Sequence, residues 1–301
     1  MDSTSFNYSV IIPHKNIPML LKRCLDSIPR RKDTQIIVVD DNSDPSIVDF
    51  SKFPGLNEPR TEVYFTKEGK GAGYARNVGL KKAKGNWILF ADADDYFNNS
   101  LDNLMDKYLL SSSDLIIFRT NSTDCDTLIP IDDRGKVYND LLVKSLEKKS
   151  VSDYVRFFIN PVWGKFFSRR FIEKHQILFD EVYTANDVMF STKSGYYAQE
   201  ILIDSEIMYC ATVRSGSLDY QYTINHIKSR FDVALDKYRF LKSRGKAKYR
   251  INVLYLINSS RKVDKKWINN FLIPSIKTID IKHNIQDLFQ LIFRKTQFIK
   301  K

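Results

Sequence analysis

The residues best suited to chemistry in this sequence are two aspartates, Asp92 and Asp94, which follow directly after an apolar run at 87–90. On an extended chain, residues two positions apart point to the same side, so both carboxylates would face one site. Two neighbouring carboxylates repel each other, and a bound divalent cation removes that penalty. Hard oxygen ligands of this kind suit Mg²⁺ or Mn²⁺. The pair is therefore a candidate metal site, and a solvated turn with an aspartate helix cap is the alternative.

A second acidic pair, Asp40 and Asp41, follows the apolar run at 35–39. Carboxylates at such a strand end can accept a hydrogen bond from a base N–H group or a ribose hydroxyl. The alternative is ordinary turn chemistry, because the residues that follow are rich in turn formers. Farther along, a glycine-rich turn at 69–73 precedes Arg76, which would face a phosphate or pair with an acid of the sheet edge.

One more carboxylate, Asp187, stands at the predicted start of a helix. A general base must reach the hydroxyl that it deprotonates, and Asp187 is a candidate for that role, whereas the alternative is a helix cap. The four histidines show no paired spacing typical of metal ligands. Neither a G-x-S-x-G sequence nor a local Cys/His signature points to nucleophilic catalysis.

Strands and helices must alternate to bring the two acidic pairs together. Short apolar runs predict strands at 8–13, 35–41, 62–67, 86–95 and 114–120. Helical spacing of apolar residues predicts helices at 17–28, 74–84, 100–112, 160–175 and 186–199, with a strand or hairpin at 200–214. Continuous apolar strands separated by helices predict a parallel sheet covered on both faces, with ligands at the carboxyl ends of its strands. Both acidic pairs lie at such ends.

The positive charge of this 301-residue chain is unevenly distributed. Its net charge is +11, yet residues 222–301 hold 19 Lys and Arg against 5 Asp and Glu, a net of +14. Three interpretations compete: a solvated basic surface, attachment to an anionic membrane through basic residues and apolar anchors, or nucleic-acid binding. No nucleic-acid motif accompanies the charge, so we expect no nucleic-acid partner. We predict a mostly helical extension at 221–301 after a domain at 1–220.

Composition excludes several protein classes. Hydrophobic residues make up 43% and charged residues 28%, as in ordinary globular proteins. The three cysteines are widely spaced, which argues against a disulfide scaffold or a zinc site and suits a reducing compartment. No secretory signal is apparent at the start, and no apolar run approaches the roughly 20 residues that span a bilayer. We therefore expect a cytoplasmic protein, peripheral at the inner face of the plasma membrane.

The ordered set of motifs resembles the family 2 glycosyltransferases of the GT-A fold. The segments that carry the resemblance are VIIPHKN at 10–16, VVDDNS at 38–43, GAGYARNVG at 71–79, GNWILFADADD at 85–95, VWGKFF at 162–167 and NDVMF at 186–190. They span roughly residues 8–215, and the set in this order is far more specific than any one motif. The resemblance implies an α/β fold with a mostly parallel central sheet flanked by helices, here over residues 1–220.

The resemblance also implies an activity. Family members transfer a sugar from a nucleotide-diphosphate donor, most often a UDP-sugar, to a hydroxyl of a glycan or lipid-linked acceptor. The transfer uses Mn²⁺ or Mg²⁺ and usually inverts the anomeric carbon. Cell-surface polysaccharide synthesis is the process that such an enzyme would serve.

Roles can be carried over by position. The residues that would line the nucleotide pocket are Pro13, Asn16, Asp40, Asp41, Arg76 and Asp92. Asp94 would ligate the metal that bridges the diphosphate, and Asp187 would deprotonate the acceptor hydroxyl. Asn186 stands where the family has Glu, which removes a negative charge beside Asp187.

Two other functions remain as alternatives. A sugar-phosphate nucleotidyltransferase has a similar sheet, but it would carry a glycine-rich loop after the first strand, and residues 14–23 contain no glycine. The second alternative is a module that has the same fold and binds a nucleotide sugar or polyanion but has no catalytic activity. The presence of Asp92, Asp94 and Asp187 together argues against that module.

Overall fold

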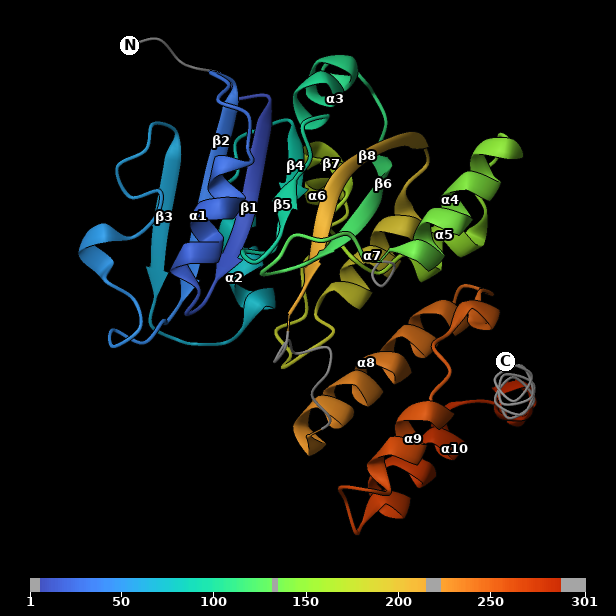
Figure 1. Ribbon diagram of the computed structural model, residues 1–301. Helices are drawn as coiled ribbons and strands as arrows, with labels where there is room; N and C mark the ends of the chain where they lie inside the picture. The colour runs from blue at the N-terminus through green and yellow to red at the C-terminus, as the bar shows by residue number, and fades with distance from the viewer. Residues whose placement is uncertain (1–5, 132–134, 215–222, 288–301) are drawn as a thin grey trace. The chain divides into compact units, whose positions relative to one another are not determined.

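The computed structural model describes residues 6–131, 135–214 and 223–287, which form two compact units (Figure 1). The first unit contains residues 6–181 and 190–214, and the second contains residues 182–189 and 223–287. The predicted boundary between residues 220 and 221 lies outside the described residues. The second unit therefore includes a short segment, 182–189, from the middle of the chain.

One eight-stranded sheet, in the order β3-β2-β1-β4-β7-β6-β8-β5, forms the centre of the first unit. Its strands are β1 (Tyr8–His14), β2 (Thr34–Asp41), β3 (Thr61–Thr66), β4 (Trp87–Phe90), β5 (Tyr96–Phe97), β6 (Leu115–Asp124), β7 (Lys165–Ser168) and β8 (Ile201–Val213). Strands β1 to β4 pair in parallel, as do β6 and β8, whereas β7 runs antiparallel between β4 and β6 and β5 runs antiparallel at the edge. The mostly parallel sheet predicted from the sequence is confirmed.

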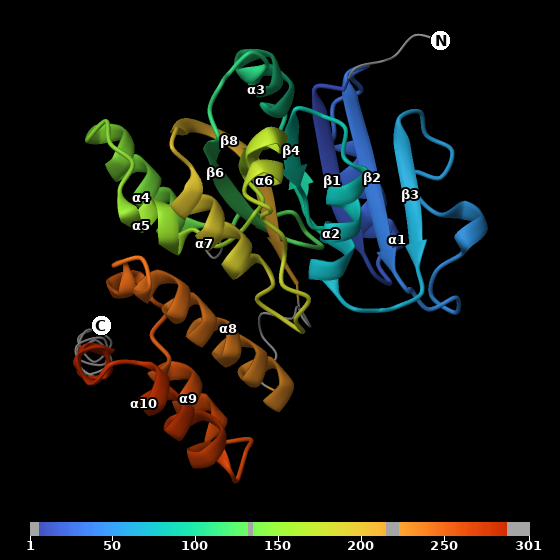
Figure 2. The same ribbon diagram turned by 180° about the vertical axis from the view of Figure 1, so that it is seen from behind.

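Helices cover both faces of this sheet. They are α1 (Pro18–Asp26), the 3₁₀ turn η1 (Phe50–Lys52), α2 (Ala72–Lys82), α3 (Leu101–Tyr108), α4 (Lys136–Glu147), α5 (Asp153–Phe158), α6 (Arg169–Lys174) and α7 (Asp187–Tyr197). Helices α1 and α3 lie in front of the sheet in Figure 1, whereas α2 and α6 lie on the opposite face, nearest the viewer in Figure 2. The boundary between the two units falls within α7, after Met189.

The side chains of β1 alternate between the two faces of the sheet, and they are buried on both. Val10 and Ile12 belong to the apolar cluster that also contains Leu21 of α1, whereas Ile11 belongs to the cluster on the other face, with Ala75 of α2. All of these side chains are fully buried. Because successive residues of a strand point to opposite faces, a continuous apolar run is what a strand between two helical layers requires.

The predicted helix at 160–175 is wrong over its first half. Residues 165–168 form β7, and only α6 is helical within this range. Phe166 and Phe167 are both fully buried, one in each of the two apolar clusters, as a central strand demands. A four-residue segment with only two apolar residues, such as Lys165–Ser168, cannot be assigned to strand or helix by periodicity alone. Nearby, the predicted strand or hairpin at 200–214 is the single strand β8.

The second unit is helical and has an apolar core of its own. Its elements are α8 (Ile224–Lys242), the 3₁₀ turn η3 (Ala247–Tyr249), α9 (Leu254–Ser260), the π-helical turn η4 (Ile268–Leu272) and α10 (Ile273–Thr278). Phe231 and Tyr238 of α8 are buried against Leu256 of α9 and Phe271 of η4. Among the described residues, none of the helices is both long and apolar enough to cross a bilayer.

Candidate active site

Both predicted acidic pairs lie at the carboxyl ends of parallel strands of the sheet. Asp40 and Asp41 are the last residues of β2, and Asp92 follows β4 closely. Strand β1 lies between them and ends in Pro13 and His14. Adjacent strands are about 4.8 Å apart, so the sheet order itself brings these groups together.

The carboxylate of Asp40 is hydrogen-bonded to neighbouring residues of the protein. Its Oδ1 lies 2.7 Å from Nδ1 of His14 and also accepts from the Ser43 hydroxyl, while its Oδ2 accepts from the Ser43 backbone N–H at 2.9 Å. Nε2 of His14 accepts a hydrogen bond from the Ile17 N–H, so Nδ1 carries the proton and donates to Asp40. Burial alone would raise the pKa of Asp40, but the hydrogen bonds from His14 and Ser43 hold that pKa below its ordinary value. Asp40 thus fixes the two loops that follow β1 and β2.

The neighbouring carboxylate, Asp41, is buried but only half satisfied. Its Oδ2 accepts a hydrogen bond of 2.8 Å from the Gly71 N–H, and Lys15 Nζ lies 3.7 Å from the same oxygen. Its Oδ1 is buried, and no described residue provides that atom with a hydrogen-bond partner. Gly71 has a φ of 92°, which favours glycine at this turn before α2. A buried carboxylate oxygen without a donor is costly in the free protein and suits a ligand that brings an N–H or O–H group.

The predicted pocket residues Pro13 and Asn16 lie in and after β1. Pro13 is buried opposite Val39 in the register with β2. Asn16 has a left-handed backbone with a φ of 59°, its N–H donates to the Ser43 hydroxyl at 2.8 Å, and its Oδ1 accepts from the Asp44 N–H at 2.7 Å. Asn16 therefore ties the loop after β1 to the loop after β2.

The four residues at 92–95 alternate between solvent and core. The side chains of Asp92 and Asp94 are 30% and 24% exposed, whereas Ala93 and Asp95 are buried. Asp95 accepts hydrogen bonds from the Tyr209 hydroxyl and the Thr212 backbone N–H, both of β8, and so anchors the turn. Asp92 and Asp94 are thus the two members of this run with access to a ligand.

Each of these two accessible carboxylates faces an arginine. Nη2 of Arg76 lies 2.5 Å from Asp92 Oδ1, so Arg76 pairs with an acid of the sheet edge, one of the two arrangements expected for it. Nε of Arg214 lies 3.0 Å from Asp94 Oδ2. Sequence reasoning missed Arg214, because its position just after β8 carries no local motif and only the sheet order brings it to Asp94.

The residues present fit a metal ion shared with a ligand better than a metal held by protein alone. Among the described residues, no group of three or more His, Cys, Asp or Glu side chains is close enough to hold a cation. Asp94 offers one partly exposed carboxylate, a hard ligand of the kind that Mn²⁺ and Mg²⁺ prefer. Mg²⁺ in particular is usually bound by one or two carboxylates together with substrate phosphates.

Asp187 belongs to the second unit, whereas all the other predicted site residues lie in the first. It is half-buried at the start of α7. Two residues earlier, Ala185 has a left-handed backbone with a φ of 63°, and its carbonyl accepts a hydrogen bond from Val188 at 3.2 Å. A non-glycine residue in this conformation stores strain, and such strain clusters at functional sites.

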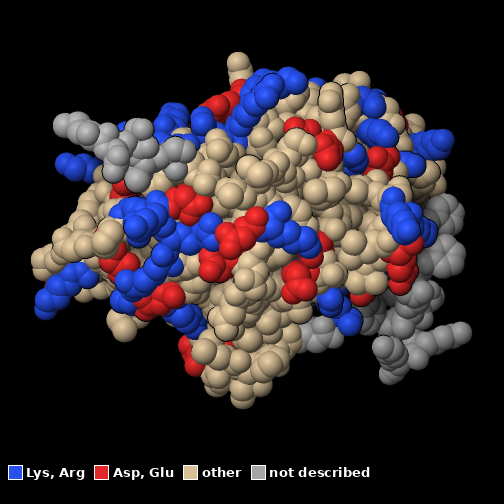
Figure 3. Space-filling view, turned by 90° about the horizontal axis from the view of Figure 1, so that it is seen from above, with Lys and Arg blue, Asp and Glu red and all other residues tan. Residues whose placement is uncertain are grey.

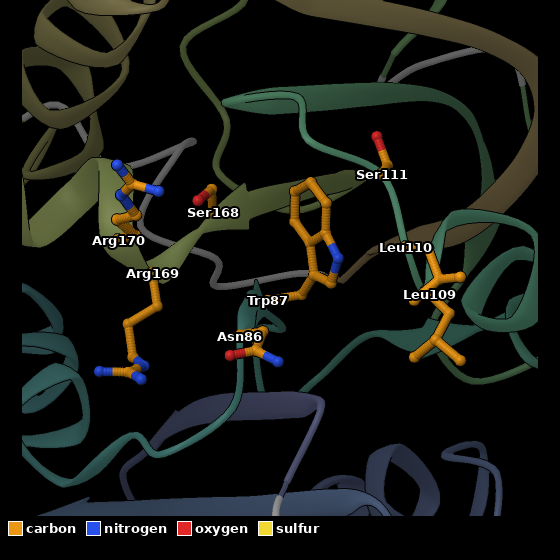
Figure 4. Close-up of a pocket in the computed structure, with 8 residues that line it drawn as sticks. All are labelled: Asn86, Trp87, Leu109, Leu110, Ser111, Ser168, Arg169 and Arg170. Carbon is orange, nitrogen blue, oxygen red and sulfur yellow. The ribbon is translucent and has the colours of Figure 1, made fainter.

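The opposite end of β4 holds a different feature. A cavity of about 230 Å³ opens there around Trp87, with Arg169 and Arg170 on one side and Leu109 and Leu110 on the other (Figure 4). Seen from above, the end at which β1 and β4 begin, basic and acidic side chains are interspersed (Figure 3). The cavity is thus separate from the predicted site carboxylates, which lie at the carboxyl ends of the strands.

The match to a known family agrees with this geometry. Residues 9–174, more than half of the chain, match the family described as glycosyl transferase family 2. The chain belongs to glycosyltransferase family 2. It is therefore a glycosyltransferase, and the enzyme class expected from the motifs is confirmed.

Curated relatives of this glycosyltransferase are bacterial. It is 26% identical to glycosyltransferase GlyA of Streptococcus pneumoniae over 253 residues, which cover 79% of this chain but only 35% of GlyA. It is 25% identical to glycosyltransferase EpsJ of Bacillus subtilis over 256 residues, covering 81% of this chain and 73% of EpsJ. The chain thus spans about a third of the length of one relative and most of the other.

Solved structures confirm the GT-A fold of this glycosyltransferase. TarS of Staphylococcus aureus, a poly(ribitol-phosphate) beta-N-acetylglucosaminyltransferase, was solved as residues 1–349 with UDP-GlcNAc. It aligns with a TM-score of 0.65 at 22% identity, over 88% of this chain and 79% of that one. A mannosyltransferase from Pyrobaculum calidifontis with GDP-Man and Mn²⁺ aligns with a TM-score of 0.58 at 16% identity, over 97% of this chain and 80% of that one. At these identities the likeness establishes the fold.

Proposed function

We propose that this enzyme transfers a sugar from a nucleoside diphosphate donor, with UDP favoured, to a hydroxyl of a glycan or lipid-linked acceptor. The observation that carries the proposal is the buried Oδ1 of Asp41, for which the described residues provide no hydrogen-bond donor. An N–H group of a nucleobase would satisfy that atom. TarS, which shares the fold, was solved with UDP-GlcNAc and with UDP, and this supports UDP as the nucleotide.

The other pocket residues would complete the donor site. Asp40, Pro13 and Asn16 would line the pocket for the base, and the hydrogen bonds of Asp40 and Asn16 to the loop after β2 support that role. Asp92 would lie near the ribose, with Arg76 fixing the direction of its carboxylate. A hydroxyl pair on the ribose offers donors that a carboxylate accepts well.

Asp94 would hold Mn²⁺ or Mg²⁺ together with the diphosphate of the donor. When bound, such an ion neutralises the negative charge that develops on the departing nucleoside diphosphate. Arg214, which pairs with Asp94 in this structure, would be released toward the phosphates as a second positive group. That a structural neighbour was solved with GDP-Man and Mn²⁺ supports this assignment.

Asp187 would act as the general base. The acceptor hydroxyl gives its proton to the carboxylate as its oxygen bonds to the anomeric carbon, and the bond from that carbon to the diphosphate breaks on the opposite face. One displacement of this kind inverts the anomeric configuration, and one carboxylate base suffices for it. Cell-surface polysaccharide synthesis is the process that we propose, since TarS acts on poly(ribitol-phosphate), a polymer.

Calorimetric titration of the protein with UDP, GDP, CDP and dTDP, each with and without Mn²⁺, tests the donor proposal. We expect UDP to bind tightest and to bind more tightly with the metal present. A preference for another nucleotide would replace UDP in the proposal. If a folded sample bound none of the four, the assignment of Asp41 to a nucleotide pocket would be wrong.

We further propose that the second unit attaches the enzyme to the anionic cytoplasmic face of the membrane. Lys262, Lys265 and Lys266 are exposed there, and Ile276 and Ile281 expose 56% and 74% of their surface. Exposed cations beside exposed aliphatic side chains are the combination that peripheral membrane attachment needs.

Replacing Lys262, Lys265 and Lys266 together by glutamine is expected to weaken binding to phosphatidylserine vesicles by about 100-fold, at about 1 kcal/mol for each lysine. Sedimentation with vesicles at low salt measures this partition. The matched control replaces three lysines of the first unit, Lys67, Lys81 and Lys82, by glutamine. Equal loss in both triple variants, or equal binding of the parent to neutral vesicles, would contradict the proposal.

A further inference from the structure

Lys237, on α8, is a charged side chain in an unusual place. It is 1% exposed, although lysine is almost never fully buried without a partner. Burial lowers its pKa to about 7, and the carboxylate of Asp187 opposes that effect. A buried ammonium group that costs this much to desolvate calls for a reason in the structure.

The face of α8 that carries Lys237 holds the segment at 182–189. Ser229, Val233 and Lys237 are four residues apart, so they lie on one side of the helix. The Ser229 hydroxyl accepts a hydrogen bond of 3.1 Å from the Thr184 N–H and donates one of 2.9 Å to the Thr184 carbonyl. Val233, one turn farther on, packs in one apolar cluster with Val188 and Met189.

Asp187 lies in the segment that these contacts hold. It is flanked by Thr184, which is hydrogen-bonded to α8, and by Val188, which is packed against α8. The left-handed backbone of Ala185 sets the turn from which α7 starts. On this face of α8, Ser229 thus bonds to the backbone of the segment, Val233 packs on its apolar side chains, and Lys237 interacts electrostatically with its carboxylate.

We propose that Lys237 is a positioning residue for Asp187, and that α8 thereby belongs to the catalytic machinery. The ammonium group attracts the carboxylate and limits the directions it can take, so the carboxylate is held ready to accept a proton. The inference rests on the role proposed above for Asp187 as the base. It assigns a second task to the basic region beyond membrane attachment.

The test is Lys237→Met in the full chain. Loss of positioning is expected to lower kcat by about 100-fold, while the KM for the donor and the affinity for UDP stay unchanged. The thermal midpoint is expected to change little, because the variant removes the cost of a buried ammonium group but also the cation that attracts the half-buried carboxylate of Asp187. Lys228→Met, at an exposed lysine of the same helix, is the matched control and should change none of these quantities.

A double variant shows whether Lys237 acts through Asp187. In the Asp187→Asn background, Lys237→Met is expected to cause no further loss, because the group it positions is already gone. An equal loss in both backgrounds, a changed UDP affinity or an unchanged kcat in Lys237→Met would overturn the inference. If Lys237→Met does not fold, Lys237→Gln takes its place under the same criteria. Full transfer by Asp187→Asn alone would instead refute the proposed base, which separates the two failures.

Discussion

Asp187→Asn is expected to lower the rate of sugar transfer by about 10³-fold and to leave UDP binding unchanged. The amide has nearly the shape of the carboxylate but cannot take a proton, and general base catalysis contributes about 10²–10⁴ in rate. Initial rates with a UDP-sugar and an acceptor hydroxyl measure the first quantity, and calorimetry with UDP measures the second.

The matched control for this change is Asp232→Asn on α8. Asp232 is an exposed carboxylate in the same unit, paired with Lys228, so its loss should leave the rate unchanged. Full transfer by Asp187→Asn would mean that another group accepts the proton. Loss of UDP binding along with the rate would mean that Asp187 supports the donor site rather than the chemistry.

Asp94→Ala is expected to remove the effect of Mn²⁺ on UDP affinity. The parent should bind UDP more tightly with the metal, whereas the variant should bind it equally with and without the metal. Loss of partners that only support a metal ligand already costs about 10–100-fold in metal affinity, so loss of the ligand itself should cost at least about 100-fold. Calorimetry of both proteins at several Mn²⁺ concentrations gives the comparison.

Asp126→Ala is the control for Asp94→Ala, because Asp126 is an exposed carboxylate of the same unit. It should retain the full metal effect. If Asp94→Ala retained it as well, the metal would have to be held by a different residue, with Asp92 the next to change. In that case the pairing of Asp94 with Arg214 would be a structural ion pair only.

The sequence predicts the carboxyl ends of the parallel strands well, because the residue patterns that mark them are local. A strand ending in carboxylates, such as β2, can be recognised from its own apolar run, and neighbouring parallel strands must end at one edge. Short β7 could not be recognised, since its neighbours β4 and β6 supply the hydrogen bonds that make it a strand. Its four residues contain no helical or alternating pattern strong enough to decide.

Individual partners depend on the fold and not on spacing. Arg214 reaches Asp94, a residue 120 positions earlier in the chain, so no local pattern could connect them. Lys237 could not be singled out from the sequence for a different reason. It is one of many cations in a basic helix, where charged side chains are expected to face solvent. Only the packing of α8 shows that it is buried. The charge count therefore indicated the basic character of this region but not the buried environment of Lys237.

The free Oδ1 of Asp41 has a consequence for the choice of nucleotide. Uracil, thymine and guanine each carry a ring N–H on the edge that a carboxylate can meet, whereas cytosine presents a ring nitrogen that only accepts. A cytosine that faced the carboxylate through this ring nitrogen would set one lone pair against another, and only its exocyclic amino group could donate to the buried oxygen. The pocket would then favour UDP over CDP by its hydrogen-bonding pattern, without any need for a steric barrier.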